Sequence, residues 1–380
     1  MLYEIHMLKN YPPTNLNRDD TGMPKTCLFG GVNRGRISSQ CLKRSWRTSP
    51  IFREEIGEES LGIRTRGLPA LVCDKLREMG IDDDRLEALL PKLTAFGNKE
   101  AKENAKGNRM AQVAFFAPED VEAVANAVFE TVKRCGTPKD VKTLKAKDLT
   151  QAVDVKEAKV RPVTLDIALF GRMVTSDAFK DVEASMQVAH AISTNKVALE
   201  SDFFTAMDDL LSGETEDEKG SAMMGDIDYN SSCYYLYASL DADALRENLK
   251  EADDPDLLVR KALPALLRVM ALSNPSGKQN SFAGHVLPSA MLIECKQKKI
   301  PVSLVNAFAE PARADRNGDL IENSIRKLAE EAALTDRNFR IPVEKRLWFC
   351  VDKYDLRPAC ETTICPTFPE LVDAAVQTLG

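Results

Sequence analysis

Strand-like and helical segments alternate along this chain without a regular spacing, and this irregularity restricts the fold more than any other feature of the sequence. Alternating or β-rich residues predict strands at 2–8, 36–38, 163–170, 232–239, 282–295 and 346–352. Amphipathic spacing predicts helices at 67–80, 83–95, 181–194, 255–273 and 320–333, with further helices opening at Pro118 and after Pro369. Because no regular β–α–β spacing separates the strands, the sequence predicts an α+β fold.

Local signals mark some of the element ends. Pro12 and Pro13 follow Tyr11 and end the first strand, since proline cannot continue a hydrogen-bonded ladder. Ser38 or Ser39 is suited to cap a helix that runs to about Phe52. Residues 60–160 are predicted to be mostly helical, and they separate the first strand–helix segment from the rest.

A strongly acidic segment stands out at residues 200–228, which hold ten acidic residues and one basic residue. Phe203-Phe204 and Met223-Met224 flank a polar tip at 212–220. This pattern predicts a long protruding loop or hairpin. We expect its acids to face solvent or the basic surface of a neighbouring copy of the chain.

The distribution of charge favours a local polyanion contact, although the net charge is −7. Residues 1–48 hold eight Lys or Arg against three acids, and residues 131–161 hold nine against four. Two basic islands in an otherwise acidic protein can hold phosphates while the remainder discourages indiscriminate binding.

Several classes of protein are disfavoured. The nine cysteines are scattered without a C-x-x-C motif and the three histidines lie far apart, so we expect reduced thiols, no metal site and no cofactor. No apolar run is long enough to cross a membrane, and the N-terminus lacks the pattern of a secretory signal. The chain is therefore expected to be cytoplasmic, without a membrane partner.

Basic residues near the N-terminus are the first candidates for contact with nucleic acid. Lys43 and Arg47 are four residues apart on one face of the predicted helix, with Arg44 beside them, and such a row suits phosphates on a single strand. Arg18 and Lys25 lie in a polar loop. The alternatives are a solvated helix face for the first group and a salt bridge of Arg18 with Asp19 or Asp20.

Three blocks of sequence closely resemble the CasC family, the repeating backbone subunit of the type I-E CRISPR surveillance complex (Cascade). The first comprises Leu16–Asp20, Phe29–Gly31 and Arg36–Arg47, the second Asp166–Met173, Ala189–Ile192 and Asp202–Leu210, and the weaker third Gly277–Gln279. Their order and rough spacing agree over about residues 2–310, and the tail beyond 320 matches less clearly.

The resemblance implies a hand-like fold. A modified RRM (ferredoxin-like) palm would carry a helical fingers insertion and a protruding thumb hairpin. The palm would comprise residues 1–58 and 161–196, together with 231–380, which also form the web. The fingers would comprise 59–160 and the thumb 197–230.

The resemblance also implies a function, that of an RNA-binding backbone subunit without catalytic activity. Several copies would stack head to tail as a helical filament along one crRNA, kink it at intervals with the thumb, and present guide segments to target DNA. The other partners would be a Cas5-like cap, a large subunit and a small subunit.

Individual roles follow from the matched positions. The resemblance implies crRNA contacts by Arg18, Lys25, Arg36, Lys43, Arg44, Arg47, Met173, Phe204, Thr205 and Lys278. In the second basic island it implies DNA contacts by Lys142, Lys145 and Lys147. From the residues alone, a core position is favoured for Met173 and Phe204, Arg36 could face the fold, and the lysines could line a solvated face.

Two further readings remain at this stage. One is a metal-dependent RNA endonuclease like the type III backbone subunits, with Asp19 or Asp20 as the catalytic aspartate. The other is a protein-interaction scaffold that does not touch nucleic acid.

Overall fold

The structure is a computed structural model, and it describes residues 1–104, 107–135, 137–206, 223–316 and 318–379. The chain divides into two compact units. The sheet unit comprises Met1–Phe52, Val188–Leu240 and Leu263–Gly380, and the helical unit comprises Arg53–Gln187 and Asp241–Ala262. The α+β class predicted from the sequence is confirmed.

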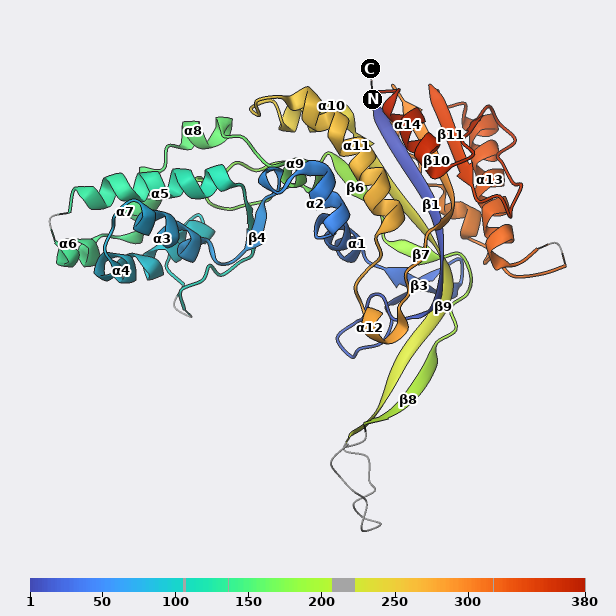
Figure 1. Cartoon of the computed structure of the whole chain (residues 1–380), viewed down its shortest axis with the longest axis horizontal. Helices are drawn as coiled ribbons and strands as arrows, with labels where there is room; N and C mark the ends of the chain where they lie inside the picture. Colours follow the sequence, from blue (N-terminus) through green and yellow to red (C-terminus); the bar gives the residue numbers. More distant parts are fainter. Residues whose placement is uncertain (105–106, 136, 207–222, 317, 380) are drawn as a thin grey trace, which may run out of the picture. The chain divides into compact units, whose positions relative to one another are not determined.

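A large, mostly antiparallel sheet forms the centre of the sheet unit (Figure 1). The order along it is β12-β11-β10-β1-β9-β7-β3-β2. These strands are β1 (Leu2–Thr14), β2 (Thr26–Phe29), β3 (Val32–Ile37), β7 (Ala191–Ser193), β9 (Met223–Asp241), β10 (Pro288–Lys296), β11 (Lys345–Cys350) and β12 (Thr363–Ile364). β12 joins β11 in parallel, whereas β1 pairs antiparallel with β10 and β10 with β11.

A hairpin extends from this sheet, as the acidic segment predicted. β8 (Glu200–Ala206) pairs antiparallel with the beginning of β9, from Glu200 opposite Tyr229 to Ala206 opposite Met223. The predicted hairpin is therefore confirmed for its two strands. The tip at 212–220 lies outside the described residues.

Helices cover the sheet and complete the core of this unit. They are α1 (Ser39–Arg47), α12 (Gln279–Phe282), α13 (Leu320–Phe339), α14 (Phe368–Val376) and the 3₁₀ helix η4 (Leu304–Phe308). Ile325 and Leu328 of α13 pack in one cluster with Leu8, Leu292 and Trp348 of the strands. This apolar burial is the main source of stability for the unit.

A buried network of charges joins the strands beneath α13. Lys296 of β10 forms ion pairs with Glu4 of β1 and, at 2.9 Å, with Glu294. Arg346 of β11 lies 2.7 Å from Glu294 and 3.0 Å from Asp336 of α13. Glu4, Lys296, Glu294 and Arg346 are all buried, so each charge depends on its partners.

The helical unit has a core of its own. Its helices are α3 (Leu68–Glu78), α4 (Asp83–Leu93), α5 (Pro118–Lys133), α6 (Pro138–Thr143), α7 (Ala146–Ala152), α8 (Val155–Val160), α9 (Leu165–Phe170) and α10 (Ala242–Asn248), with short 3₁₀ helices η1 (Glu58–Ser60) and η2 (Thr94–Gly97). β4 (Ile63–Thr65) and β5 (Ala114–Phe116) form a two-stranded sheet. Leu76, Leu89, Val124 and Val128 belong to one buried cluster.

Four elements contain a boundary between the units. They are α2 (Pro50–Ile56), β6 (Met186–Val188), β9, before its last residue, and α11 (Pro255–Leu272). Pro264 lies inside α11, which matches the helix predicted at 255–273.

Two predictions of secondary structure are wrong. Residues 163–170 were predicted as a strand but form α9, in which Leu165–Leu169 are all buried; a short apolar run does not distinguish a buried strand from a buried helix. Residues 181–194 were predicted as a helix but contain β6 and β7, since pairing of β7 with β3 and β9 overrides the local pattern. His190, expected inside that helix, therefore lies in an exposed extended segment.

Some element ends also differ from the prediction. Pro12 and Pro13 were predicted to end the first strand but lie inside β1, which continues to Thr14. Both prolines are exposed, and a strand can continue through proline where no partner needs its N–H.

The helix expected to reach Phe52 ends at Arg47, and α2 begins at Pro50. Proline disfavours a helical conformation of the residue before it and is tolerated in a first turn. The strand expected from residue 282 begins at Pro288, because α12 occupies Gln279–Phe282.

A buried lysine in β1 generates a prediction about stability. Lys9 is 1% exposed, and its Nζ donates to the Ser273 carbonyl (2.8 Å) and Asn274 Oδ1 (3.3 Å). Burial lowers its pKa from 10.5 to about 7. Between pH 7 and pH 10.5, Lys9 is protonated in the unfolded chain but deprotonated in the folded protein. In this range Lys9 should therefore raise the free energy of unfolding by about 1.4 kcal/mol per pH unit.

Lys9→Met should remove that contribution, which urea denaturation at pH 6, 7.5 and 9 would measure. The exposed Lys298→Met is the control and should keep the wild-type slope. An unchanged pH dependence in Lys9→Met would contradict the prediction.

Candidate nucleic-acid interface

The loop after β1 is fastened at both ends within the sheet unit. Asn15 Nδ2 donates to the carbonyls of Gly22 (3.0 Å) and Asp228 (2.8 Å), which joins the loop to the base of the hairpin. Asn17 Oδ1 accepts the Ser38 amide (2.9 Å), which joins it to the start of α1. The loop therefore holds its side chains in a fixed place next to α1 and β9.

Helix α1 presents basic side chains beside this loop. Ser38 caps the helix by accepting the Cys41 amide (3.4 Å), as predicted for this position. Leu42 and Trp46 are buried, whereas Arg44 is exposed and Lys43 is half-buried. Burying one stripe of the helix leaves its cations on the outer side.

Lys25, Arg36 and His190 lie close together. Arg36 Nη1 is 3.0 Å from His190 Nδ1, and Arg36 Nε donates to the Thr26 carbonyl (3.2 Å). Partial burial lowers the pKa of His190, and the charges of Arg36 and Lys25 lower it further. Burial raises the pKa of Cys41, which the nearby charges of Lys25 and Arg44 oppose. Lys25 thus shares the neighbour His190 with Arg36 and the neighbour Cys41 with Arg44, which places the three cations on one surface.

We call Arg18, Lys25, Arg36, Lys43 and Arg44 the basic face. Among the residues that the structure describes, no carboxylate forms an ion pair with any of the five. The salt bridge considered for Arg18 is not formed. Unneutralised cations on a fixed loop and helix are suited to an external anion.

Asp19 is occupied within its own loop. Its Oδ1 accepts the Thr21 amide (2.9 Å), the Thr21 hydroxyl (2.7 Å) and the Met23 amide (3.1 Å). The hydroxyl of Thr21 is the main cause that lowers the pKa of Asp19. Asp19 thus stabilises the turn that carries Arg18.

A hollow of about 520 Å³ adjoins the basic face. It is lined by residues 16–22, Cys41, Ser276 and Gly277. A side chain at Gly277 would overlap the Leu16 carbonyl, so this position requires glycine. The close approach brings the segment that carries Lys278 next to the loop, with Lys278 half-buried at the start of α12.

The hairpin has two different faces. Phe204 lies opposite Gly225, and its ring is 2.9 Å from where a side chain of residue 225 would begin. Phe203, Thr205 and Met224 share the other face, since Thr205 pairs with Met224 and Phe203 is two residues away. Phe203 is 62% and Met224 is 65% exposed.

Sequence reasoning selected Phe204 and Thr205 but missed Phe203 and Met224 as exposed candidates. The alternation of side chains along a strand was the signal that could have found them.

Four of the remaining candidates lie in the helical unit, and Arg47 lies in the sheet unit. Met173 follows Gly171 and Arg172 and is 91% exposed, so it is not a core methionine. Lys142 of α6, Lys145 before α7 and Lys147 of α7 are exposed. Arg47, at the end of α1 in the sheet unit, is half-buried.

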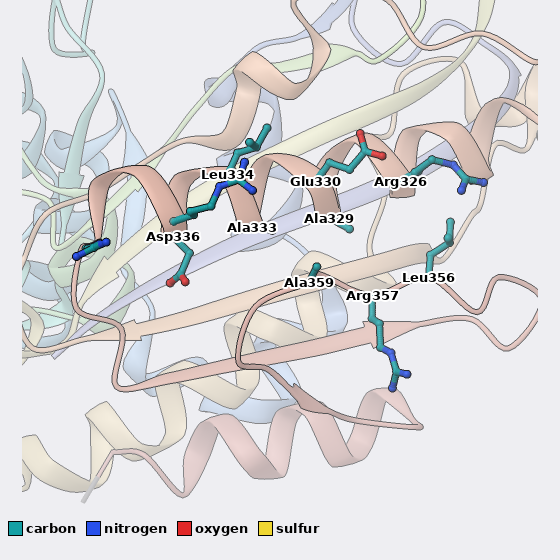
Figure 2. A pocket seen from close by; sticks show the side chains of 11 residues that line it. Arg326, Ala329, Glu330, Ala333, Leu334, Asp336, Leu356, Arg357 and Ala359 are labelled. Carbon is teal, nitrogen blue, oxygen red and sulfur yellow. The ribbon is translucent and has the colours of Figure 1, made fainter.

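A separate hollow of about 770 Å³ lies along α13 in the sheet unit (Figure 2). Arg326, Arg337 and Arg340 line it from the helix side, and Arg357 lines it from the facing segment. Part of the lining charge is neutralised internally, because Arg326 pairs with Glu322 (3.0 Å) and Asp336 pairs with Arg346 (3.0 Å). This hollow was not predicted from the sequence.

Within the described ranges, no group of three or more His, Cys, Asp or Glu side chains could hold a metal ion. In the same part of the chain, no helix is long and apolar enough to span a membrane.

The fold and the basic face define an α+β protein with a candidate anion-binding surface, a long hairpin and a separate helical unit. The profile of the CT1975-like protein family matches residues 3–374, and the chain belongs to this family. No curated protein matches the chain.

Two solved structures share the fold over the full length of both chains. One, titled "CRISPR RNA-guided surveillance complex, pre-nicking", has a TM-score of 0.82 and 24% sequence identity over 100% of each chain. The other, titled "CRISPR RNA-guided surveillance complex", has a TM-score of 0.71 and 23% identity, again over 100% of each chain. At this level of identity the likeness establishes the fold.

The hydrogen bonds of Asp19 generate a prediction. Asp19→Ala removes three bonds that hold Thr21 and Met23, so these amides should exchange with solvent several-fold faster than in the wild type. Hydrogen–deuterium exchange by mass spectrometry would measure this. Asp20→Ala, an exposed neighbour, is the matched control and should leave the exchange unchanged; equal protection in Asp19→Ala and wild type would refute the role.

Proposed function

We propose that this chain is the RNA-binding backbone subunit of a CRISPR RNA-guided surveillance complex, of the type I-E CasC kind. The observation that carries the proposal is the basic face, whose cations form no ion pair with a described carboxylate, on a fold shared end to end with a chain of such a complex. The basic face would hold the phosphates of a crRNA.

The chemistry of the basic face suits a guide of any sequence. Cations that neutralise phosphates bind without reading bases, and their contribution depends on counterion release. The net charge of −7 repels nucleic acid elsewhere, which confines binding to local positive surfaces. Arg47 at the end of α1 and Lys278 beside the hollow would extend the row of contacts.

The hairpin would supply the apolar contacts. Phe203, Thr205 and Met224 form a partly apolar face, and exposed aromatic or thioether groups can pack on any base. Phe204 would support this face from behind through its contact with Gly225. We propose that the hairpin kinks the crRNA at intervals in a head-to-tail filament of several copies, with Met173 contacting a nucleotide.

The proposed domains follow the hand-like arrangement. Residues 1–58, 161–196 and 231–380 would form the palm and web, 59–160 the fingers and 197–230 the thumb. Lys142, Lys145 and Lys147 of the fingers would contact target DNA. A Cas5-like cap, a large subunit and a small subunit would complete the complex, and a cytoplasmic location stays a prediction.

We further propose that the subunit is not an enzyme. Asp19 accepts three hydrogen bonds within its loop, and this role in the turn favours a structural aspartate over a metal ligand. The endonuclease reading would require Asp19 or Asp20 to bind a metal ion.

Binding of RNA is tested by fluorescence anisotropy with a labelled unstructured RNA at several salt concentrations. Lys43→Glu/Arg44→Glu should weaken binding at least about tenfold and reduce the slope of log affinity against log salt, since two phosphate contacts are lost. Lys261→Glu/Lys298→Glu changes the net charge equally at exposed sites and should bind almost as wild type.

Equal losses in both variants would mean that net charge, and not the basic face, governs binding. If the wild type binds no RNA, the co-expressed complex should be purified; a complex free of RNA would sink the proposal.

The absence of cleavage is tested with guide-matched RNA and Mg²⁺ or Mn²⁺. The RNA should remain intact on a denaturing gel. Cleavage by the wild type that disappears in Asp19→Ala or Asp20→Ala would establish the endonuclease reading instead.

A further inference from the structure

A groove of about 570 Å³ runs along α5 in the helical unit. Its other wall is the segment that leads from the end of α7 through α8, which Figure 1 shows beside α5. The basic face contributes no residue to it, and neither do Lys142, Lys145 and Lys147; the basic island at 131–161 contributes Arg134 and Arg161.

The sequence of α5 separates two stripes of side chains. Val121, Val124, Val128 and Val132 are buried in the core of the unit. Glu119, Glu122, Ala123, Asn126, Ala127, Glu130, Thr131 and Arg134 recur at helical spacing on the other side and line the groove. The small residues Ala123 and Ala127 leave room for a main chain to approach the helix.

Five carboxylates surround the groove. They belong to Glu119, Glu122, Glu130, Asp154 and Glu157, all of which are exposed. In the described part of the chain, none of the five forms an ion pair. Arg134 is the exposed cation in the lining. The rim therefore has an excess of negative charge that a cationic partner would relieve.

The second observation is a buried arginine in the lining of the groove, Arg161. Arg161 is 9% exposed, and its Nη1 donates to Asp120 Oδ1 (3.0 Å) and to the Ala178 carbonyl (3.4 Å). Its Nη2 is buried without a hydrogen-bond partner. Arg172 also pairs with Asp120, so the carboxylate is already shared between two guanidinium groups. The Nη2 donor needs an acceptor from outside this cluster.

The two observations specify the chemistry of the occupant. It must bring cations to the rim and an oxygen acceptor to Arg161. A protein segment rich in lysine or arginine has both, since each residue supplies a carbonyl oxygen and the side chains supply charge. A phosphate could accept from Arg161, but the surrounding carboxylates would repel a polyanion.

We propose that this groove docks a lysine- or arginine-rich segment of a partner protein. The segment lies along α5, its side chains pair with the glutamates, and one of its carbonyl oxygens accepts from Arg161 Nη2. Glu119 and Glu130 are eleven residues apart, roughly 16 Å along the helix, which about five residues of an extended segment would span. This inference does not depend on RNA binding.

The test uses the full chain and a fluorescein-labelled octapeptide of alternating lysine and glycine as probe, at low salt. The rim variant Glu119→Gln/Glu122→Gln/Glu130→Gln should weaken binding at least about tenfold. Asp84→Asn/Glu87→Gln/Glu103→Gln removes three exposed carboxylates elsewhere in the same unit and is the matched control. It should bind the probe within about twofold of wild type.

Two further arms separate docking from simple charge attraction. Spermine has cations but no carbonyl, so it should displace the probe much less well than unlabelled peptide at equal charge. Ala127→Gln narrows the groove without changing its charge and should also weaken the probe. Equal losses in the rim and control variants, or displacement by spermine as effective as by peptide, would overturn the proposal.

Binding of labelled RNA to the rim variant should remain at the wild-type level. If the wild type, all variants and the co-expressed complex bind no RNA but the peptide results are as expected, the proposed function is wrong and the docking proposal is supported. Loss of RNA binding confined to the rim variant would show that the groove serves nucleic acid and would overturn the inference.

Discussion

The arrangement of the sheet unit depends on the buried ion pairs that join β1, β10 and β11. Glu4 and Glu294 lie directly opposite each other across two antiparallel strands, and without a cation between them their charges would repel. Lys296 lies beside both, and Arg346 completes the network from β11. A shift of the strands by one residue would separate these partners and leave charges buried alone, so the network specifies the register. The loop that carries Arg18 begins where β1 ends, and its position follows from that register.

Because a buried charge needs partners, the basic residues fall into two groups: some hold the fold together, and others remain available for binding. Arg34 belongs to the N-terminal basic island in the sequence, yet it is completely buried. Its guanidinium donates to the carbonyls of Phe29, Ser193, Thr194, Phe308 and Ala309. Arg44, ten residues later, is exposed and has no ion pair with a described carboxylate. Counting charges along a sequence cannot make this distinction, because it depends on which backbone carbonyls the fold brings together.

Much of the fold was predictable where local signals agree with tertiary packing. The Ser38 cap, the helices at 67–80 and 83–95 and the strands of the acidic hairpin follow from capping, spacing and composition. Residues 163–170 and 181–194 were mispredicted, since burial on all sides erases the periodicity of α9 and sheet pairing decides β7. The hollow along α13 and the groove beside α5 were not predictable, because their lining residues are distant in sequence and gather only through packing. Arg161 illustrates this: nothing local indicates that its Nη2 is left without an acceptor.

β9 is a single strand of nineteen residues that belongs both to the central sheet and to the hairpin. Its N-terminal part, Met223–Tyr229, pairs with β8, and its C-terminal part lies between β1 and β7. The base of the hairpin is braced as well, by Asn15 at Asp228 and by the Ser231 hydroxyl at the Tyr11 carbonyl (3.0 Å). No break in β9 therefore separates the part paired with β8 from the part in the central sheet. A force applied to Phe203 or Met224 would therefore be transmitted along the backbone of β9 into the central sheet.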